Sequence, residues 1–255
     1  MFERLKCYWD RTQVIGVMME RVLVFDVWGE YAHFRKYYTT TSPLTFSMPP
    51  RTAVCGLISA IIGLSKDEYL KHFSKDKADI AVRIMAPINK IRFSENLIDT
   101  TSTSTMNRIK NRTQIRFEFL KNARFRIYLR HKESVLYQHL NEYLIHHKCV
   151  YTPCLGLSEH IANFGFVGEF GCEIRSEIED FVQIDSVIPI RQDSNLKINF
   201  EDGGEYFHET LPIEMEEDRT LREYCKVAFE RNGSPILAKI DKYWELENGE
   251  RIVFL

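Results

Sequence analysis

The sequence predicts an α+β fold, because short β-branched runs alternate with two apolar segments long enough for helices. Hydrophobic residues make up 44% of the 255 residues and charged residues 27%, which is typical of a globular protein. The predicted order of strand, helix, strand, strand, helix and strand indicates a ferredoxin-like or RRM-like domain with an inserted β-hairpin. A small β-rich C-terminal region follows it.

The first strand and the first helix are predicted from the N-terminal third. Val22–Val27 is short, apolar and β-branched, so it indicates a buried strand. Residues 28–47 are polar, aromatic and Thr-rich, so we expect a long loop or a ragged hairpin. Two prolines precede the apolar segment Thr52–Leu64, as at a helix N-terminus. A short second helix and a strand are expected next, over Lys66–Phe73 and Ile80–Met85.

A protruding hairpin is predicted in the middle of the chain. Residues 88–113 show no sustained hydrophobic period, and 100–105 are nearly all Thr and Ser. An unpatterned stretch of this length is usually functional or disordered. Strands over Thr113–Phe119 and Ala123–Arg130 would turn it into a finger. An amphipathic helix over Lys132–His147 and a strand over Phe164–Val167 would then complete the domain.

The predicted boundaries divide the chain into an N-terminal extension (1–18), an RRM-like domain (19–164) and a β-rich region (165–255). The extension shows no period, so we expect it to be dispensable. Glycine and proline turns separate short strands in the last region, at Gly171–Ile174, Phe181–Ile190, Leu196–Phe200, Glu205–Leu211, Ile236–Ile240 and Arg251–Leu255.

Several functional classes are excluded by motifs that the sequence lacks. No apolar run approaches the ~18 residues of a membrane span, and no secretory signal is visible. The six cysteines include no C-x-x-C pair, so we expect reduced thiols, no metal site and a cytoplasmic protein. Phosphate-binding loops, dinucleotide loops and hydrolase elbows are absent, so no cofactor and no small-molecule substrate are expected.

A strongly basic block interrupts a chain whose net charge is only −2. Residues 90–132 contain 11 Lys and Arg but three Asp and Glu, a net charge of +8. So few carboxylates cannot neutralise the block internally, which favours a polyanionic partner. A solvated face or a subunit contact is the alternative. The finger cations Arg108, Lys110, Arg112 and Arg116 are candidate RNA ligands.

Cations alternate with aromatic residues between positions 35 and 56, a combination that suits single-stranded RNA. Core packing is the alternative for the aromatic residues. Arg51 and Thr52 stand at a predicted helix N-terminus, where free N–H groups favour an anion, and Gly56 would allow close approach of another backbone. The candidate RNA-binding residues here are Arg35, Lys36, Tyr37, Tyr38, Phe46, Arg51, Thr52 and Gly56.

His131 and Lys132 lie together after a predicted strand, inside the basic block. A metal-independent ribonuclease needs an acid or base beside a cation that stabilises the pentacovalent phosphate. Tyr37 could complete such a set. The alternatives for His131 are a structural position at a helix start and a simple RNA contact.

These segments resemble the CRISPR-associated Cas-five family. The resemblance rests on the order and spacing of motifs over about residues 19–160. They are Ala32-x-Phe34-Arg35-Lys36, Pro49-Pro50-Arg51-Thr52, Gly56–Leu64 and the later Leu155-Gly156-Leu157-Ser158. The resemblance implies an RRM-like domain with an inserted thumb at about 88–116, and it adds Gly156 and Ser158 to the RNA-binding candidates. The segment pattern looks more like a type I-B or I-A member.

The resemblance also implies a function. The protein would be a non-catalytic subunit of a type I Cascade complex in antiviral defence. It would cap the 5′ handle of the crRNA, join the backbone and large PAM-reading subunits, and lie near target DNA at the start of the guide. Base pairing by the guide would read the target. The alternatives are a metal-independent endoribonuclease using Tyr37, His131 and Lys132, and an unrelated RRM-like RNA-binding module.

Overall fold

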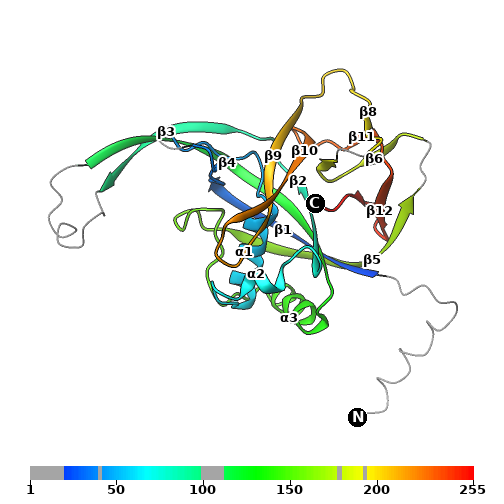
Figure 1. The fold of residues 1–255 in the computed structure, drawn as a ribbon, viewed down its shortest axis with the longest axis horizontal. Coiled ribbons are helices and arrows are strands. Elements are labelled where there is room, and N and C mark those ends of the chain that lie inside the picture. The colour runs from blue at the N-terminus through cyan, green and yellow to red at the C-terminus, as the bar shows by residue number, and fades with distance from the viewer. Residues whose placement is uncertain (1–19, 40–41, 99–111, 177–179, 192–193) are drawn as a thin grey trace, which may run out of the picture.

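A seven-stranded antiparallel sheet forms the centre of the computed structural model, which describes residues 20–39, 42–98, 112–176, 180–191 and 194–255 (Figure 1). The strand order is β13-β12-β5-β1-β4-β2, and β3 pairs with β4 outside this path. The strands are β1 (Glu20–Ala32), β2 (Ala78–Ile84), β3 (Lys90–Ile98), β4 (Arg112–His131), β5 (Asn163–Ser176), β12 (Lys242–Leu246) and β13 (Arg251–Ile252).

The helices cover one face of this sheet. Strand β1 has apolar side chains on both faces, and those on one face pack against the helices. Leu23, Phe25 and Val27 are buried in the larger core with the helices, whereas Val22 and Val24 belong to a second cluster on the opposite face. The three helices are α1 (Arg51–Ile62), α2 (Tyr69–His72) and α3 (Ser134–Ile145). Both long helices confirm the sequence prediction within two residues at each end.

Two small sheets make up most of the C-terminal region. One has the order β7-β10-β9 and packs on the main core through Leu211, Val227 and Phe229. The other has the order β6-β11-β8 and lies over a separate cluster with Ile184 and Ile236. Their strands are β6 (Val182–Ile184), β7 (Ile188–Ile190), β8 (Lys197–Ile198), β9 (Tyr206–Met215), β10 (Leu221–Glu230) and β11 (Ile236–Lys239).

The finger consists of β3 and the first half of β4, which project together from the sheet (Figure 1). β4 pairs with β3 up to Leu120 and with β1 from Leu120 onward, so one continuous strand belongs to both parts. The prediction of two strands here was wrong. The gap between the two predicted strands contains Asn122, which has a positive φ of 53° but lies within the continuous strand β4.

Other sequence expectations are corrected by strand pairing that is invisible locally. Residues 28–32 continue β1, because Trp28 and Tyr31 pair with β4. Residues 90–98 form β3 although no period was apparent. Strands β10 and β12 were not predicted, since their charged residues obscure the alternation. Residue 164, the predicted domain boundary, lies inside β5, and β12 extends the same sheet.

Candidate nucleic-acid interface

The finger is a ribbon with two chemically different faces. Residues that are directly opposed across the two strands share a face. One face therefore carries Lys90 and Arg92 from β3, with Arg116 and Glu118 from β4. The other side is apolar and is partly exposed at its outer end, where Phe93 is 39% and Leu97 37% exposed. The apolar face contains Ile91, Phe93, Leu97, Ile115, Phe117 and Phe119.

Five of the nine described cations of the basic block are ion-paired, so fewer of them are free than the sequence alone suggests. Arg126 donates to Asp26 at 2.7 Å and to Glu250 at 2.8 Å, and Arg124 donates to Asp26 at 2.8 Å. These carboxylates, Asp26 and Glu250, lie outside the block and far from it in sequence. Lys90, Arg92 and Arg130 also have carboxylate partners, namely Glu209, Glu118, Glu20 and Asp79.

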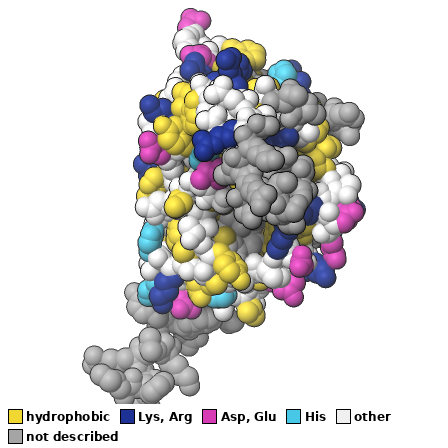
Figure 2. All heavy atoms as spheres, turned by 90° about the vertical axis from the view of Figure 1, so that its left-hand side faces the viewer, with side chains coloured by type: hydrophobic (Ala, Val, Ile, Leu, Met, Phe, Trp, Pro, Cys, Tyr) yellow, Lys and Arg dark blue, Asp and Glu magenta, His cyan; other side chains and the backbone are white. Residues whose placement is uncertain are grey.

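The described cations of the block that can meet a polyanion are therefore fewer, and all of them except Lys132 lie along the finger or at its base. Arg112, Arg116 and Lys121 are exposed and form no ion pair with any described residue. Arg108 and Lys110 lie outside the described residues, as does the N-terminal extension 1–18. Figure 2 views the side from which the finger projects, and Lys and Arg side chains lie there among hydrophobic ones.

Three exposed tyrosines form a surface cluster beside this region. Tyr37 packs edge-on against Tyr38 with ring centroids 5.1 Å apart, and against Tyr224 at 4.9 Å. Their exposed fractions run from 41% to 60%, so the rings remain accessible for stacking with bases. Arg35 is exposed nearby in the same loop. Tyr224 comes from β10 and was missed, because only the folded chain brings it beside Tyr37.

Lys36 and Phe46 are positioned as structural residues and not as RNA ligands. Lys36 donates to Glu209 at 3.0 Å, and its ammonium group lies 5.5 Å from the centre of the Phe46 ring. Burial alone would lower the pKa of Lys36, but Glu209 raises it above its usual value. Phe46 is only 2% exposed and belongs to the main core. The core-packing alternative therefore applies to Phe46.

Arg51 is likewise buried, contrary to the predicted anion site. Its guanidinium donates to the carbonyl oxygens of Ile213 at 3.1 Å and Ala78 at 2.7 Å. It therefore connects α1 to β9 and β2 and cannot reach a phosphate at the surface. Thr52 is half-buried, and a Cβ added at Gly56 would meet no atom within 4 Å, so no backbone approaches that glycine closely.

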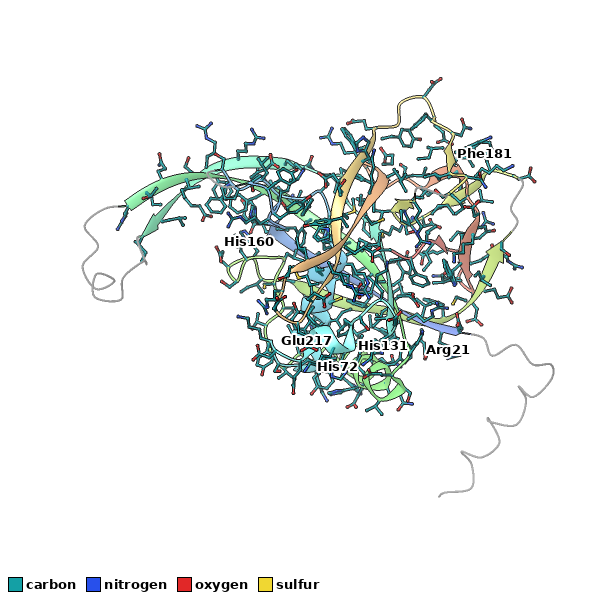
Figure 3. The ribbon with its side chains drawn as sticks, viewed as in Figure 1. Arg21, His72, His131, His160, Phe181 and Glu217 are labelled. Carbon is teal, nitrogen blue, oxygen red and sulfur yellow. The ribbon has the colours of Figure 1, made fainter. Side chains whose placement is uncertain are left out.

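His131 has no free ring nitrogen for catalysis. Its Nε2 donates to the His72 carbonyl at 2.9 Å, and its Nδ1 accepts from the Glu133 N–H at 3.0 Å. Figure 3 shows His131 beside His72, away from the base of the finger where His160 lies. Burial lowers the pKa of His131. These contacts support the structural alternative, while Lys132 is exposed.

The loop with Gly156 and Ser158 packs against the end of β1. His33 N–H donates to the Leu155 carbonyl at 3.0 Å, and Gly156 adopts a positive φ of 96°. A Cβ at Gly156 would lie 1.9 Å from the His33 carbonyl oxygen, so only glycine fits. Ser158 is exposed and donates to Glu159 at 3.1 Å.

Neither a metal centre nor a membrane helix is found in the part of the chain that the structure describes. No three His, Cys, Asp or Glu side chains cluster there closely enough to hold a metal ion. Within the same residues, no helix combines the length and apolar character needed to cross a membrane.

Comparison with known proteins decides the family. A family model described as CRISPR-associated protein (Cas_Cas5) matches residues 22–221. The chain belongs to this family. A search of curated proteins gives no match to this Cas-five chain.

One of three solved structures compared with this chain has a similar fold, by a TM-score above 0.5, at low sequence identity. A CRISPR protein from Archaeoglobus fulgidus is 15% identical with a TM-score of 0.55, over 91% of this chain and 97% of that one. A chain of a CRISPR RNA-guided surveillance complex is 10% identical with a TM-score of 0.47, over 84% and 91%. A chain of a type III-B Cmr-beta complex bound to cognate target RNA is 13% identical with a TM-score of 0.47, over 86% of both.

Two motifs that suggested the Cas-five family contribute to its fold. Arg51 connects α1 to two strands, and Gly156 allows the loop to contact the backbone of His33. The family signal is therefore carried partly by residues that build the domain.

Proposed function

We propose that this protein is a non-catalytic subunit of a type I CRISPR effector complex and binds the 5′ handle of the crRNA. The observation that carries the proposal is the family match over residues 22–221. The backbone subunit, the large PAM-reading subunit and target DNA near the guide start are its proposed partners. The family match excludes the alternative of an unrelated RRM-like module.

The described topology supports an RRM-like or ferredoxin-like assignment for the N-terminal domain. Strands β5-β1-β4-β2 lie side by side, with α1 between β1 and β2 in the chain and α3 between β4 and β5. The finger of β3 and β4 is then the thumb. We propose that residues 19–164 make up this RNA-binding domain, although its sheet continues through β5 and β12 into the C-terminal region.

The proposed RNA surface combines the tyrosine cluster with the finger cations that have no ion pair with a described residue. Positive side chains contact the phosphates of a single strand, and aromatic rings stack with its bases. We retain the candidates that have an exposed or half-buried side chain not ion-paired with a described residue, and add Lys121 and Tyr224. The proposed contacts are Arg35, Tyr37, Tyr38, Thr52, Arg112, Arg116, Lys121, Ser158 and Tyr224.

RNA captured in cells tests this function. The chain is co-expressed with a CRISPR array and the partner subunits of its own locus, and the RNA that copurifies is sequenced. We expect one population whose 5′ ends fall at a fixed position within the repeat. A double substitution, Arg116→Gln with Lys121→Gln, should reduce the yield of this RNA. RNA with unrelated 5′ ends at wild-type yield would contradict the proposal.

A cleavage assay tests the non-catalytic assignment separately. We expect purified protein to leave precursor crRNA uncut with or without metal, because both ring nitrogens of His131 are engaged. Removing a positioned acid or base costs a ribonuclease ~10²–10⁴-fold in rate. Cleavage at the handle boundary that Tyr37→Phe or His131→Ala abolishes, with binding intact, would establish the endoribonuclease instead.

A further inference from the structure

A cleft of about 320 Å³ opens between the β9–β10 ribbon and the base of the finger. This volume lies within the range of small-molecule sites. The cleft is distinct from the tyrosine cluster, because none of the three tyrosines lines it. Its walls are Ser47, Ile88, Lys90, Phe207, His208, Glu209, Phe229 and Arg231.

One wall of the cleft is a flat aromatic surface. The ring of Phe207 is stacked on Phe229, with centroids 6.1 Å apart and planes inclined by 26°. Phe229 is 3% exposed and anchored in the core, whereas Phe207 is 51% exposed. Phe229 therefore supports Phe207 from within the protein, while much of Phe207 remains open to a planar partner. An exposed phenylalanine supported in this way is suited to stacking with a nucleobase.

One cation beside the cleft, Arg231, keeps a donor for an anionic group beside that planar partner, although it is also ion-paired with Glu205. Arg231 donates through Nε to the Ile88 carbonyl at 3.1 Å and through Nη1 to Glu205 at 2.7 Å. Its Nη2 forms no hydrogen bond with a described residue, and its side chain is 40% exposed. Arg231 is therefore held in place with one donor edge unused.

The carboxylate in the cleft does not oppose an anion, because its charge is already compensated. Glu209 Oε1 accepts from Lys36 at 3.0 Å and Lys90 at 3.4 Å, and Oε2 accepts from the Ser47 N–H at 2.8 Å. Burial alone would raise the pKa of Glu209, but Lys90, the Ser47 N–H and Lys36 together hold it below its usual value.

The cleft is continuous with the polar face of the finger. Lys90 lines the cleft and also begins β3, where it shares a face with Arg92 and Arg116. A single strand lying along that face would reach the cleft past Glu118, whose carboxylate is ion-paired with Arg92 and Lys90. The finger cations would then contact its phosphates, as single-stranded RNA requires.

We propose that this cleft binds one unpaired nucleotide, with its base stacked on Phe207 and its phosphate beside Arg231. A nucleotide combines the planar ring that the aromatic wall favours with the negative charge that the free guanidinium edge favours. The inference extends the proposed RNA-binding function, and a nucleotide within RNA is its expected source. A free mononucleotide presents the same chemistry and is distinguished below.

Fluorescence of a base analogue tests the proposal with the full chain. A single 2-aminopurine is placed at each position in turn of a 12-nucleotide single-stranded RNA carrying the repeat-derived handle sequence. We expect strong quenching at one position when the protein binds. Phe207→Ala should abolish that quenching and weaken the affinity by about 5- to 100-fold, since stacking is worth ~1–3 kcal/mol per base. Phe207→Trp should restore both.

The matched control is Phe181→Ala. Phe181 is 46% exposed in the same C-terminal region but does not line the cleft (Figure 3). It should bind and quench as the wild type does, and thermal unfolding of every variant confirms that each is folded. A second experiment measures the binding of AMP, GMP, CMP and UMP by saturation-transfer NMR. If Phe207→Ala removes the mononucleotide signal but not the quenching in RNA, the natural ligand of the cleft is a free nucleotide.

The outcomes separate this inference from the proposed function. The protein could bind RNA with the expected salt dependence while neither the quenching at any base position nor the mononucleotide signal depends on Phe207. That result overturns the proposal for the cleft alone. Equal losses in Phe207→Ala and Phe181→Ala overturn it as well. Failure to bind any RNA overturns the proposed function, and the mononucleotide arm then decides the cleft.

Discussion

Replacing Gly156 with alanine should destabilise the protein far more than its exposed position in a loop suggests. The residue has a φ of 96°, and an added Cβ would lie 1.9 Å from the His33 carbonyl oxygen and 2.8 Å from its carbon. Both are backbone atoms, so no side-chain rotation can relieve the overlap. The loop must move away from β1.

The cost can be worked out from two parts. A side chain in the left-handed region costs about 1–2 kcal/mol. Moving the loop separates the His33 N–H from the Leu155 carbonyl, now 3.0 Å apart, and a buried donor left without a partner costs about 1–3 kcal/mol. The expected loss of unfolding free energy is therefore about 2–5 kcal/mol. At roughly 2–4 °C per kcal/mol, the midpoint should fall by about 4–20 °C.

Urea unfolding followed by circular dichroism measures this loss, and Gly203→Ala is the matched control. Gly203 also has a positive φ, of 85°, but an added Cβ there would meet no atom within 4 Å. The control should show only the backbone cost of about 1–2 kcal/mol. Equal destabilisation of the two variants would refute the argument, because the contact with His33 would then contribute nothing.

Three further predictions follow from the buried and exposed charges. Arg51→Met should lower the free energy of unfolding in urea by about 3–6 kcal/mol, since it removes two hydrogen bonds from a charged group, each worth about 1.5–3 kcal/mol. Unchanged stability would contradict its connecting role. Arg116→Gln should reduce the slope of log affinity for RNA against log salt concentration by ~0.7. Lys36→Gln should leave the slope unchanged, because Glu209 already neutralises Lys36. Identical slopes for the two variants would argue against the assignment of the finger as an RNA-binding element. Burial lowers the pKa of His33, His131 and His160 in the folded state. The free energy of unfolding should therefore fall as the pH drops below 6.5, the ordinary pKa of histidine, and level off below the folded-state pKa values. Constant stability between pH 7 and 5 would contradict this.

The sequence was sufficient for elements whose pattern is strong and local. The apolar segment after two prolines predicted α1, and the β-branched run predicted the buried half of β1. The outer finger was not predicted as strand, because Glu95 interrupts the alternation of Ile91, Phe93 and Leu97 with polar residues. Its structure depends on pairing with β4, about 20 residues away.

The site was predicted only in part, because charge pairing is a property of the folded chain. The basic block has an excess of cations in sequence, but Asp26 compensates Arg124 and Arg126 from about 100 positions away. Arg51 was expected to bind an anion because it stands at a helix N-terminus with free N–H groups, yet it is buried and donates to the Ile213 carbonyl of β9. Conversely, the exposure of Tyr37 and Tyr38 agrees with the original expectation, and their role in RNA binding stays a prediction.

The continuity of β4 restricts how the finger can change in length. Its register is fixed at Leu120, where the strand enters the sheet. An insertion in the finger part of β4 therefore shifts the residues outward from Leu120 and leaves the sheet part in register. An insertion of one residue before Leu120 would turn Arg116 to the apolar side and Phe117 to the polar side. Paired insertions of two residues in both strands would leave the sides intact. Related proteins with longer or shorter fingers should therefore differ in steps of two residues per strand.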